Sequence, residues 1–250
     1  MNQPDPWAFL QTHTAARIAR GRTGHSLPTR ALLDFQLDHA RARDAVYAHL
    51  DTTTLLAGFG ALLPHPLNLR SRATDRPTYL QRPDLGRRLA DESVQTLAVV
   101  GSPNATLAIV VADGLSATAV NHHALPVVAG LLGEAQRRHW SVAPLCLVEQ
   151  GRVAIGDEIA HALGAELVVV LIGERPGLSS PDSLGAYLTY RPRPGLTDES
   201  RNCVSNIRPE GMAYELAVAK IAYLLDEMRS QRLSGVALKD QMPNSDRQLT

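Results

Sequence analysis

Lysine, aromatic residues, cysteine and long apolar runs are all scarce in this chain of 250 residues. The 25 basic residues balance the 25 acidic ones, so the basic excess with which a protein neutralises nucleic-acid phosphates is missing. Aromatic residues make up 4%, too few for a surface that stacks single-stranded bases. No apolar run reaches the roughly 18 residues of a membrane-spanning helix. Because Cys146 and Cys203 are the only cysteines, a disulfide framework is excluded and a reducing compartment is favoured.

Arginine takes the place of lysine almost throughout, since Lys220 and Lys239 are the only lysines. A coding bias that favours arginine would account for this. A need for guanidinium groups that bind carboxylates or phosphates bidentately, or that hold a subunit interface, would also account for it. The sequence leaves both explanations open. The apolar fraction of 44% is typical of a folded globular protein.

The composition divides the chain into three parts. Residues 1–93 are predicted to form an irregular helical N-terminal region, with a helix over 27–50 and a short one over 85–93. Residues 94–240 are predicted to form an α/β domain, and residues 241–250 a polar tail. In the α/β domain, short apolar runs alternate with helical stretches at 116–138, 156–163 and 211–229.

The short runs are rich in Val and Ile, as expected of strands that are buried on both faces of a sheet. They are LAVVG (97–101), LAIVVAD (107–113), VAPLCLV (142–148), LVVVLIG (167–173) and AYLTY (186–190). Strand–helix alternation predicts a doubly wound, mostly parallel, Rossmann-like sheet. Ligands of such sheets lie beyond the carboxyl ends of the strands, so the loops near 113, 150, 175 and 203 are the candidate sites.

Asp113 and Ser116 follow the predicted strand 107–113. Turn formation by Asp113-Gly114 and helix capping by Ser116 account for this sequence locally. An acidic residue at a strand end, followed by a hydroxyl, also resembles metal-dependent phosphohydrolases. A stand-alone hydrolase built on these two residues is therefore the alternative function, and a binding module without an enzymatic partner is a third.

Other kinds of site have weak support. Cys203 has no histidine near it in sequence that could act as its base. The nine histidines form no HxH or HExxH motif, and there is no CxxC, so we expect no metal site. His122 and His123 are expected on the surface of the helix over 116–138. Neither a Walker motif nor a dinucleotide-binding fingerprint occurs, so the residues alone give no reaction.

The candidate loops, taken in order, resemble the small (light) subunit of ethanolamine ammonia-lyase, and the similarity covers about residues 7–240. The matching strings are ARIARGRTGHSLPTRALLDFQLDHARARDAV (16–46), SRATDRPTYLQRPDLGRRL (71–89), VVADGLSATAV (110–120), VEQGRVAIGDEI (148–159), VVVLIGERPGLSSPDSLGAYLTYRPRPG (168–195) and RNCVSNIRPEG (201–211).

The resemblance implies an enzyme that converts ethanolamine to acetaldehyde and ammonia with adenosylcobalamin by a radical mechanism. It also implies a catalytic large subunit with a TIM-type barrel, and six copies of each subunit. The small subunit helps to bind the cobalamin at the subunit interface through positions that match Val153, Glu174 and Cys203 here. It supplies no catalytic residue, so the isolated chain is expected to be inactive.

The resemblance also bears on location. Many relatives carry a longer N-terminal extension that is linked to packaging in a bacterial microcompartment, whereas this chain reaches family sequence within about ten residues. We therefore expect a cytoplasmic enzyme and regard encapsulation by that route as doubtful.

Overall fold

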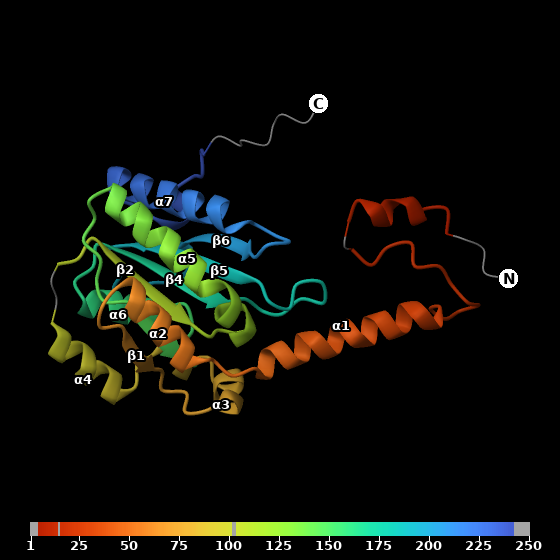
Figure 1. Cartoon of the computed structure of the whole chain (residues 1–250), viewed down its shortest axis with the longest axis horizontal. Coiled ribbons are helices and arrows are strands. Elements are labelled where there is room, and N and C mark those ends of the chain that lie inside the picture. The colour runs from red at the N-terminus through yellow and green to blue at the C-terminus, as the bar shows by residue number, and fades with distance from the viewer. Residues whose placement is uncertain (1–4, 15, 102–103, 243–250) are drawn as a thin grey trace.

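A six-stranded sheet forms the centre of the computed structural model, which describes residues 5–14, 16–101 and 104–242 (Figure 1). Its strands are β1 (Leu67–Arg70), β2 (Leu107–Ala112), β3 (Cys146–Glu149), β4 (Leu167–Gly173), β5 (Leu184–Tyr190) and β6 (Asn202–Ile207). They lie in the order β1-β3-β2-β4-β5-β6. Every residue of β2 and β4 is buried, as their continuous apolar sequences predict.

The sheet is parallel only from β1 to β4. β5 pairs antiparallel with β4, and β6 pairs antiparallel with β5. Residues 174–183 join β4 to β5 without a helix, and a chain that makes no crossover returns antiparallel. A mixed α/β fold with a mostly parallel sheet is therefore confirmed, whereas the doubly wound, Rossmann-like arrangement is not.

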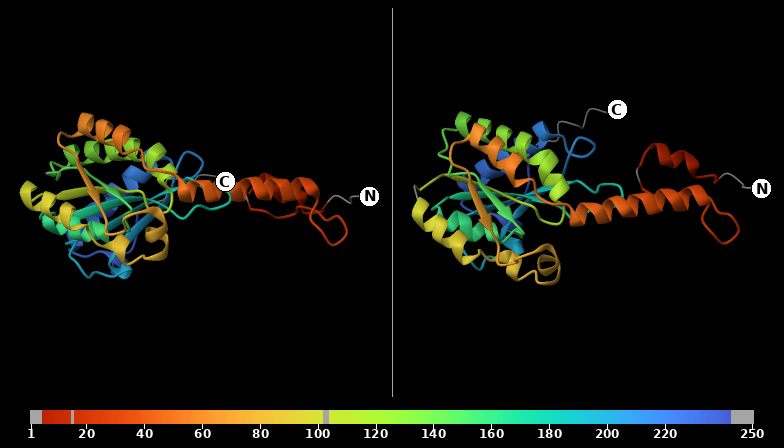
Figure 2. Two further views of the ribbon diagram at one scale, coloured as in Figure 1. Left: turned by 90° about the horizontal axis from the view of Figure 1, so that it is seen from below. Right: turned by 60° about the horizontal axis from the view of Figure 1, so that its bottom comes forward.

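Helices cover both faces of the parallel part of the sheet (Figure 2). The helices of the described chain are α1 (Thr29–Tyr47), α2 (Thr52–Leu62), α3 (Arg76–Gln81), α4 (Asp91–Val100), α5 (Ala117–Arg137), α6 (Ile155–Ala162) and α7 (Tyr214–Gln231). α2, α5 and α7 enclose the larger hydrophobic core, and α4 and α6 enclose a smaller one on the other face. None of the described helices is long and apolar enough to cross a membrane.

The antiparallel end of the sheet is covered differently on its two faces. α7 packs on β5 and β6 from the side of the larger core, where Val204 and Ile207 are buried. On the other side, α6 packs on β2 and β4, and the side chains of Cys203 and Ser205 are exposed. Tyr187, which pairs with Cys203, is half-buried there. We call the surface formed by Tyr187, Cys203 and Ser205 the open face.

One predicted strand is wrong, because residues 97–100 of the run 97–101 belong to α4. Asp91 and Glu92 lie in the first turn of this helix, where negative charge is favourable. Only Ser93 and Leu97 are buried, one helical turn apart, and Gly101 follows with φ 70°. A short apolar run does not distinguish strand from helix, but the acidic start and the glycine end were signals of a helix.

The N-terminal part of the chain departs from the expected irregular helical region. β1 lies within residues 1–93 and forms an edge of the sheet, so this region contributes to the central fold. α1, as expected, occupies most of 27–50, and it projects away from the sheet with the preceding segment beside it (Figure 1). The boundary between 93 and 94 stays a prediction. Of the tail over 241–250, only residues 241–242 are among the described residues.

Candidate functional site

Val153, Glu174 and Cys203 come from three segments on the same side of the sheet. Val153 lies in the loop before α6 and packs against the smaller core. Glu174 directly follows β4, and Cys203 belongs to β6. The half-buried Tyr187 of β5 packs against the same core as Val153 and pairs with Cys203. Glu174 and Cys203 thus lie at or next to the open face, and Val153 packs against the core that Tyr187 also contacts.

The carboxylate of Glu174 lies over β5 and reaches β6. A Cβ atom on Gly185 would stand 2.9 Å from Oε1 of Glu174, so the absence of a side chain on Gly185 makes room for the carboxylate. Oε2 accepts a hydrogen bond from the backbone N–H of Asn206 at 3.2 Å. Within the described part of the chain, Oε1 has no hydrogen-bond partner and can accept one from a ligand.

Cys203 and Tyr187 are neutral at physiological pH. Although the Cys203 side chain is exposed, neighbouring protein atoms partly desolvate its thiol, and this is the main cause that raises its pKa; a contact with the Ser205 hydroxyl at 3.2 Å opposes the rise. Burial, followed by the neighbouring Cys203, raises the pKa of Tyr187 to about 12. The open face therefore offers packing surface and hydrogen bonds, and no activated nucleophile.

Two buried side chains, those of Asp113 and Tyr79, form hydrogen bonds with the loop that carries Val153. Asp113 accepts hydrogen bonds from the backbone N–H groups of Gln150 and Gly151 at 2.9 and 3.0 Å. The hydroxyl of Tyr79 donates to the carbonyl of Gly151 at 3.2 Å. Burial raises the pKa of Asp113 to about 6, and the two N–H groups limit that rise. Asp113 thus holds the loop that positions Val153.

Ser116 also has a structural role. Its hydroxyl oxygen accepts a hydrogen bond from the N–H of Ala119, so Ser116 caps α5. The same hydroxyl donates a hydrogen bond to the carbonyl of Pro181 at 2.9 Å. Both Asp113 and Ser116 are buried, with exposed fractions of 2% and 0%. Because their polar atoms are engaged inside the protein, their geometry gives no support to a phosphohydrolase.

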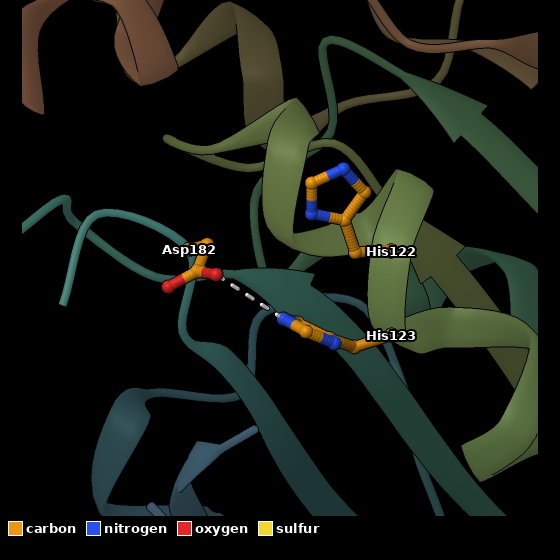
Figure 3. A group of neighbouring side chains, drawn as sticks. All are labelled: His122, His123 and Asp182. Carbon is orange, nitrogen blue, oxygen red and sulfur yellow. Dashed lines mark ion pairs between the residues drawn. The ribbon is translucent and has the colours of Figure 1, made fainter. Parts of the chain in front are cut away.

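His122, His123 and Asp182 form the one group of possible metal ligands found among the described residues (Figure 3). Their ligand atoms lie within 4.8 Å of one another. His123 is buried, which corrects the expectation that both histidines lie on the surface. It shares the face of α5 that holds Val120 and Val127, three and four residues away. This periodicity was the signal that sequence reasoning missed.

The contacts of this group with Tyr214 and Arg208 favour a structural role over a metal site. Nδ1 of His123 lies 2.7 Å from the hydroxyl of Tyr214, and Nε2 lies 3.6 Å from Oδ2 of Asp182. Burial is the main cause that lowers the pKa of His123, and Asp182 opposes it. Arg208 already pairs with Oδ1 of Asp182 at 3.1 Å, and its positive charge would oppose a bound cation. We therefore assign no metal to this group.

Sequence reasoning also missed the residues that support the site from distant segments. Arg76 reaches the carbonyls of Val46 and Gly114, both at 2.7 Å, and Arg208 reaches the loop after β4. No local pattern marks such residues, because their partners are separated from them by 26 to 38 positions in the chain.

Comparison with known proteins gives consistent matches. The family model described as "Ethanolamine ammonia-lyase light chain (EutC)" matches residues 4–239. The chain is 56% identical over 240 residues to the ethanolamine ammonia-lyase small subunit of Pseudomonas fluorescens (strain Pf0-1), covering 95% of this chain and 88% of that protein. It is 55% identical over 240 residues to the small subunit of Azotobacter vinelandii, covering 95% and 89%. For the small subunit of Ralstonia nicotianae, the values are 54% over 239 residues, 94% and 88%.

Proposed function

Because this chain belongs to the ethanolamine ammonia-lyase light-chain family and is a subunit of a lyase holoenzyme, we propose that its open face binds adenosylcobalamin. In this proposal the cofactor lies between the open face and a catalytic large subunit with a barrel fold. The holoenzyme converts ethanolamine to acetaldehyde and ammonia, and the isolated chain is inactive. When bound, adenosylcobalamin supplies the radical that abstracts a hydrogen from the substrate.

The observation that carries the proposal is that the Glu174 carboxylate and Cys203 lie at the open face, while Val153 packs against the same core as Tyr187. Cobalamin is bulky and rich in amides, so a surface that binds it needs neutral packing contacts and a few fixed polar groups. The open face has this character, since Cys203 and Tyr187 are neutral. Its chemistry therefore fits the cofactor.

Each of the three residues has a separate role in this proposal. Oε1 of Glu174 accepts a hydrogen bond from a ribose hydroxyl or a corrin amide, while Oε2 stays bound to the N–H of Asn206. Val153 supplies apolar contact from its fixed loop. Cys203 supplies a small packing surface on β6. None of the three performs a chemical step.

The projecting helix α1 supports the existence of a large partner. It exposes Leu32, Leu33, Phe35 and Leu37, of which Leu33 is 58% exposed. Several large apolar side chains on one exposed helix are typical of a surface that is buried in an assembly. We therefore propose that α1 contacts the large subunit, with six copies of each subunit in the holoenzyme. Co-purification and native mass measurement test both statements.

Substitution of Glu174 tests the cofactor site. Glu174→Ala in the reconstituted holoenzyme removes a hydrogen-bond acceptor from a partly buried contact, which costs about 1–3 kcal/mol. The dissociation constant of adenosylcobalamin is then expected to rise roughly 5- to 150-fold. Glu166→Ala is the matched control, because Glu166 precedes β4 at its opposite end and pairs with Arg229. An unchanged affinity in Glu174→Ala would show that Glu174 does not contact the cofactor.

Activity measurements separate the proposal from its alternative. The isolated chain is expected to have no ammonia-lyase activity, and to gain it only with the large subunit and adenosylcobalamin. Phosphatase turnover that is independent of cobalamin and lost in Asp113→Asn would instead favour the hydrolase. A cytoplasmic location outside a microcompartment also stays a proposal, and co-purification with shell proteins would contradict it.

A further inference from the structure

Arg208 fastens the loop after β4, residues 174–183, to the end of β6. Nη1 of Arg208 donates to Oδ1 of Asp182 at 3.1 Å, and Nη2 donates to the carbonyl of Ser179 at 3.1 Å. Nε donates to Oδ1 of Asn206 at 3.2 Å. Its side chain is only 14% exposed. All three nitrogens of the planar guanidinium are thus used within the protein, in a geometry that lysine cannot reproduce.

Asn206 is the link between Arg208 and Glu174. Its backbone has φ 58°, a left-handed conformation that asparagine tolerates better than most residues. Its carbonyl accepts the N–H of Met212 at 2.8 Å, and Gly211 leaves room for that carbonyl, since a Cβ there would stand 2.3 Å from it. With its side chain held by Arg208, Asn206 directs its own N–H to Oε2 of Glu174.

Other contacts of the loop, among them that of Asp182 with His123, lead to other parts of the fold. Pro181 accepts a hydrogen bond from Ser116 at the start of α5, and the carbonyl of Leu178 accepts one from Arg17 at 3.4 Å. These contacts hold the middle of the loop, away from β6. Among the described residues, the loop is hydrogen-bonded to residues 202–212 through Arg208 and through Glu174 itself. Loss of Arg208 would therefore leave Glu174 held to β6 by its own single bond.

We propose that Arg208 is a positioning residue, which fixes the carboxylate of Glu174 over the open face for a polar group of the cofactor. This inference rests on the proposed function and adds to it a residue that need not touch the cofactor. Arg208 acts through the bond from Asn206 to Glu174 and through the loop. Its effect on cofactor binding therefore depends on the presence of Glu174.

The test is a cofactor titration of the reconstituted holoenzyme with adenosylcobalamin. Arg208→Met is expected to raise the dissociation constant about 3- to 30-fold, with turnover at saturating cofactor nearly unchanged, because a few neutral or charge-assisted hydrogen bonds are lost. Arg208→Lys keeps the charge beside Asp182 but cannot bond all three acceptors, so it is expected to lie between wild type and Arg208→Met. If Arg208→Met does not assemble, Arg208→Lys decides the question.

Arg138→Met is the matched control. Arg138 is also a partly buried arginine that pairs with two carboxylates, those of Glu134 and Asp226, but it lies at the far end of α5. Its substitution is expected to leave the affinity for adenosylcobalamin unchanged. An equal loss of affinity in Arg138→Met would show that general destabilisation explains the result, and would overturn the proposal.

The double variant Glu174→Ala/Arg208→Met separates positioning from a merely structural role. If Arg208 acts through Glu174, the double variant binds adenosylcobalamin as weakly as Glu174→Ala alone. If the fold-losses of affinity in the two single variants multiply in the double variant, the proposal is overturned. An unchanged affinity in Arg208→Met or Arg208→Lys would also overturn it. If Glu174→Ala itself has no effect, the proposed cofactor site fails. If Glu174→Ala weakens adenosylcobalamin binding and the Arg208 variants do not, only the positioning role of Arg208 fails.

Discussion

Arg201 and Asp157 form a buried ion pair that joins two segments bearing the proposed site. Asp157 lies in the first turn of α6, four residues after Val153, and Arg201 lies two residues before Cys203. Their side chains are 3% and 2% exposed and are hydrogen-bonded to each other. Arg201 also donates to the carbonyl of Thr197. Replacing Arg201 by Met should therefore leave a buried carboxylate without its counter-charge.

The expected loss is large. Removing one partner of a buried pair costs about 3–5 kcal/mol, because the remaining charge stays desolvated. For a chain of this length, each kcal/mol shifts the melting temperature by roughly 2–4 °C, so a decrease of about 6–20 °C is expected. Arg43→Met is the control, since Arg43 and Asp44 pair on the exposed side of α1 with 67% and 73% exposure, and no measurable change is expected there.

The loss should also depend on pH. Burial, opposed by Arg201, raises the pKa of Asp157 to about 6 in the folded protein. Without Arg201 that pKa rises further. A raised folded-state pKa means that the folded protein binds the proton more tightly than the unfolded chain, so stability falls as pH rises toward that pKa. The difference between wild type and Arg201→Met should thus be smallest near pH 4 and grow toward pH 8.

Urea unfolding followed by circular dichroism between pH 4 and pH 8 measures this difference. A second variant, Asp157→Leu/Arg201→Met, also removes the unpaired carboxylate of Asp157 and should recover most of the lost stability. A loss below about 1 kcal/mol at pH 8, the level of an exposed pair, would refute the reasoning. So would a double variant that is as unstable as Arg201→Met.

Two further predictions concern the thiols and the cap of α5. Iodoacetamide should modify Cys203 and spare Cys146 in the native chain, because burial raises the pKa of Cys146 to about 12; peptide mass spectrometry reads this out. Since the pKa of Cys203 is also raised, its alkylation should be slow at pH 7 and faster above pH 9, and cofactor in the holoenzyme should protect it. Ser116→Ala should lower the free energy of unfolding by about 1–2 kcal/mol in urea, because α5 loses its cap and the carbonyl of Pro181 loses its donor. An unchanged midpoint would contradict that capping role.

The parts of the fold that the sequence predicts well are those with a strong local pattern. β2 and β4 are continuous apolar runs, and α5 follows a serine cap with apolar residues at helical spacing. The hairpin of β4 and β5 was missed, because an apolar run does not show the direction of the next strand. Pro176, Gly177 and Pro181 were an available signal, since a segment with these residues does not form a crossover helix.

The site, like the fold, has residues that the sequence indicates and residues that only the structure reveals. Glu174 and Cys203 were reached through the resemblance to a family, and their contact with a cofactor stays a prediction. Arg208 lies in the string RNCVSNIRPEG but had no predicted role, since its bonds to Ser179 and Asp182 span 29 and 26 residues. Buried polar groups need partners, but the sequence does not say which distant groups those partners are.

The charges around the open face have a common arrangement. Asp113, Asp157, Arg201 and Arg208 are all buried or nearly so, and they bond to backbone groups or to each other. Because leaving any of them unpaired is costly, these groups fix the loops and strands behind the face. The face itself presents a neutral thiol, a neutral phenol and the hydroxyl of Ser205, and the carboxylate of Glu174 lies next to it. Such a surface suits the bulky cofactor that we propose, which would bind through shape and a few directed hydrogen bonds.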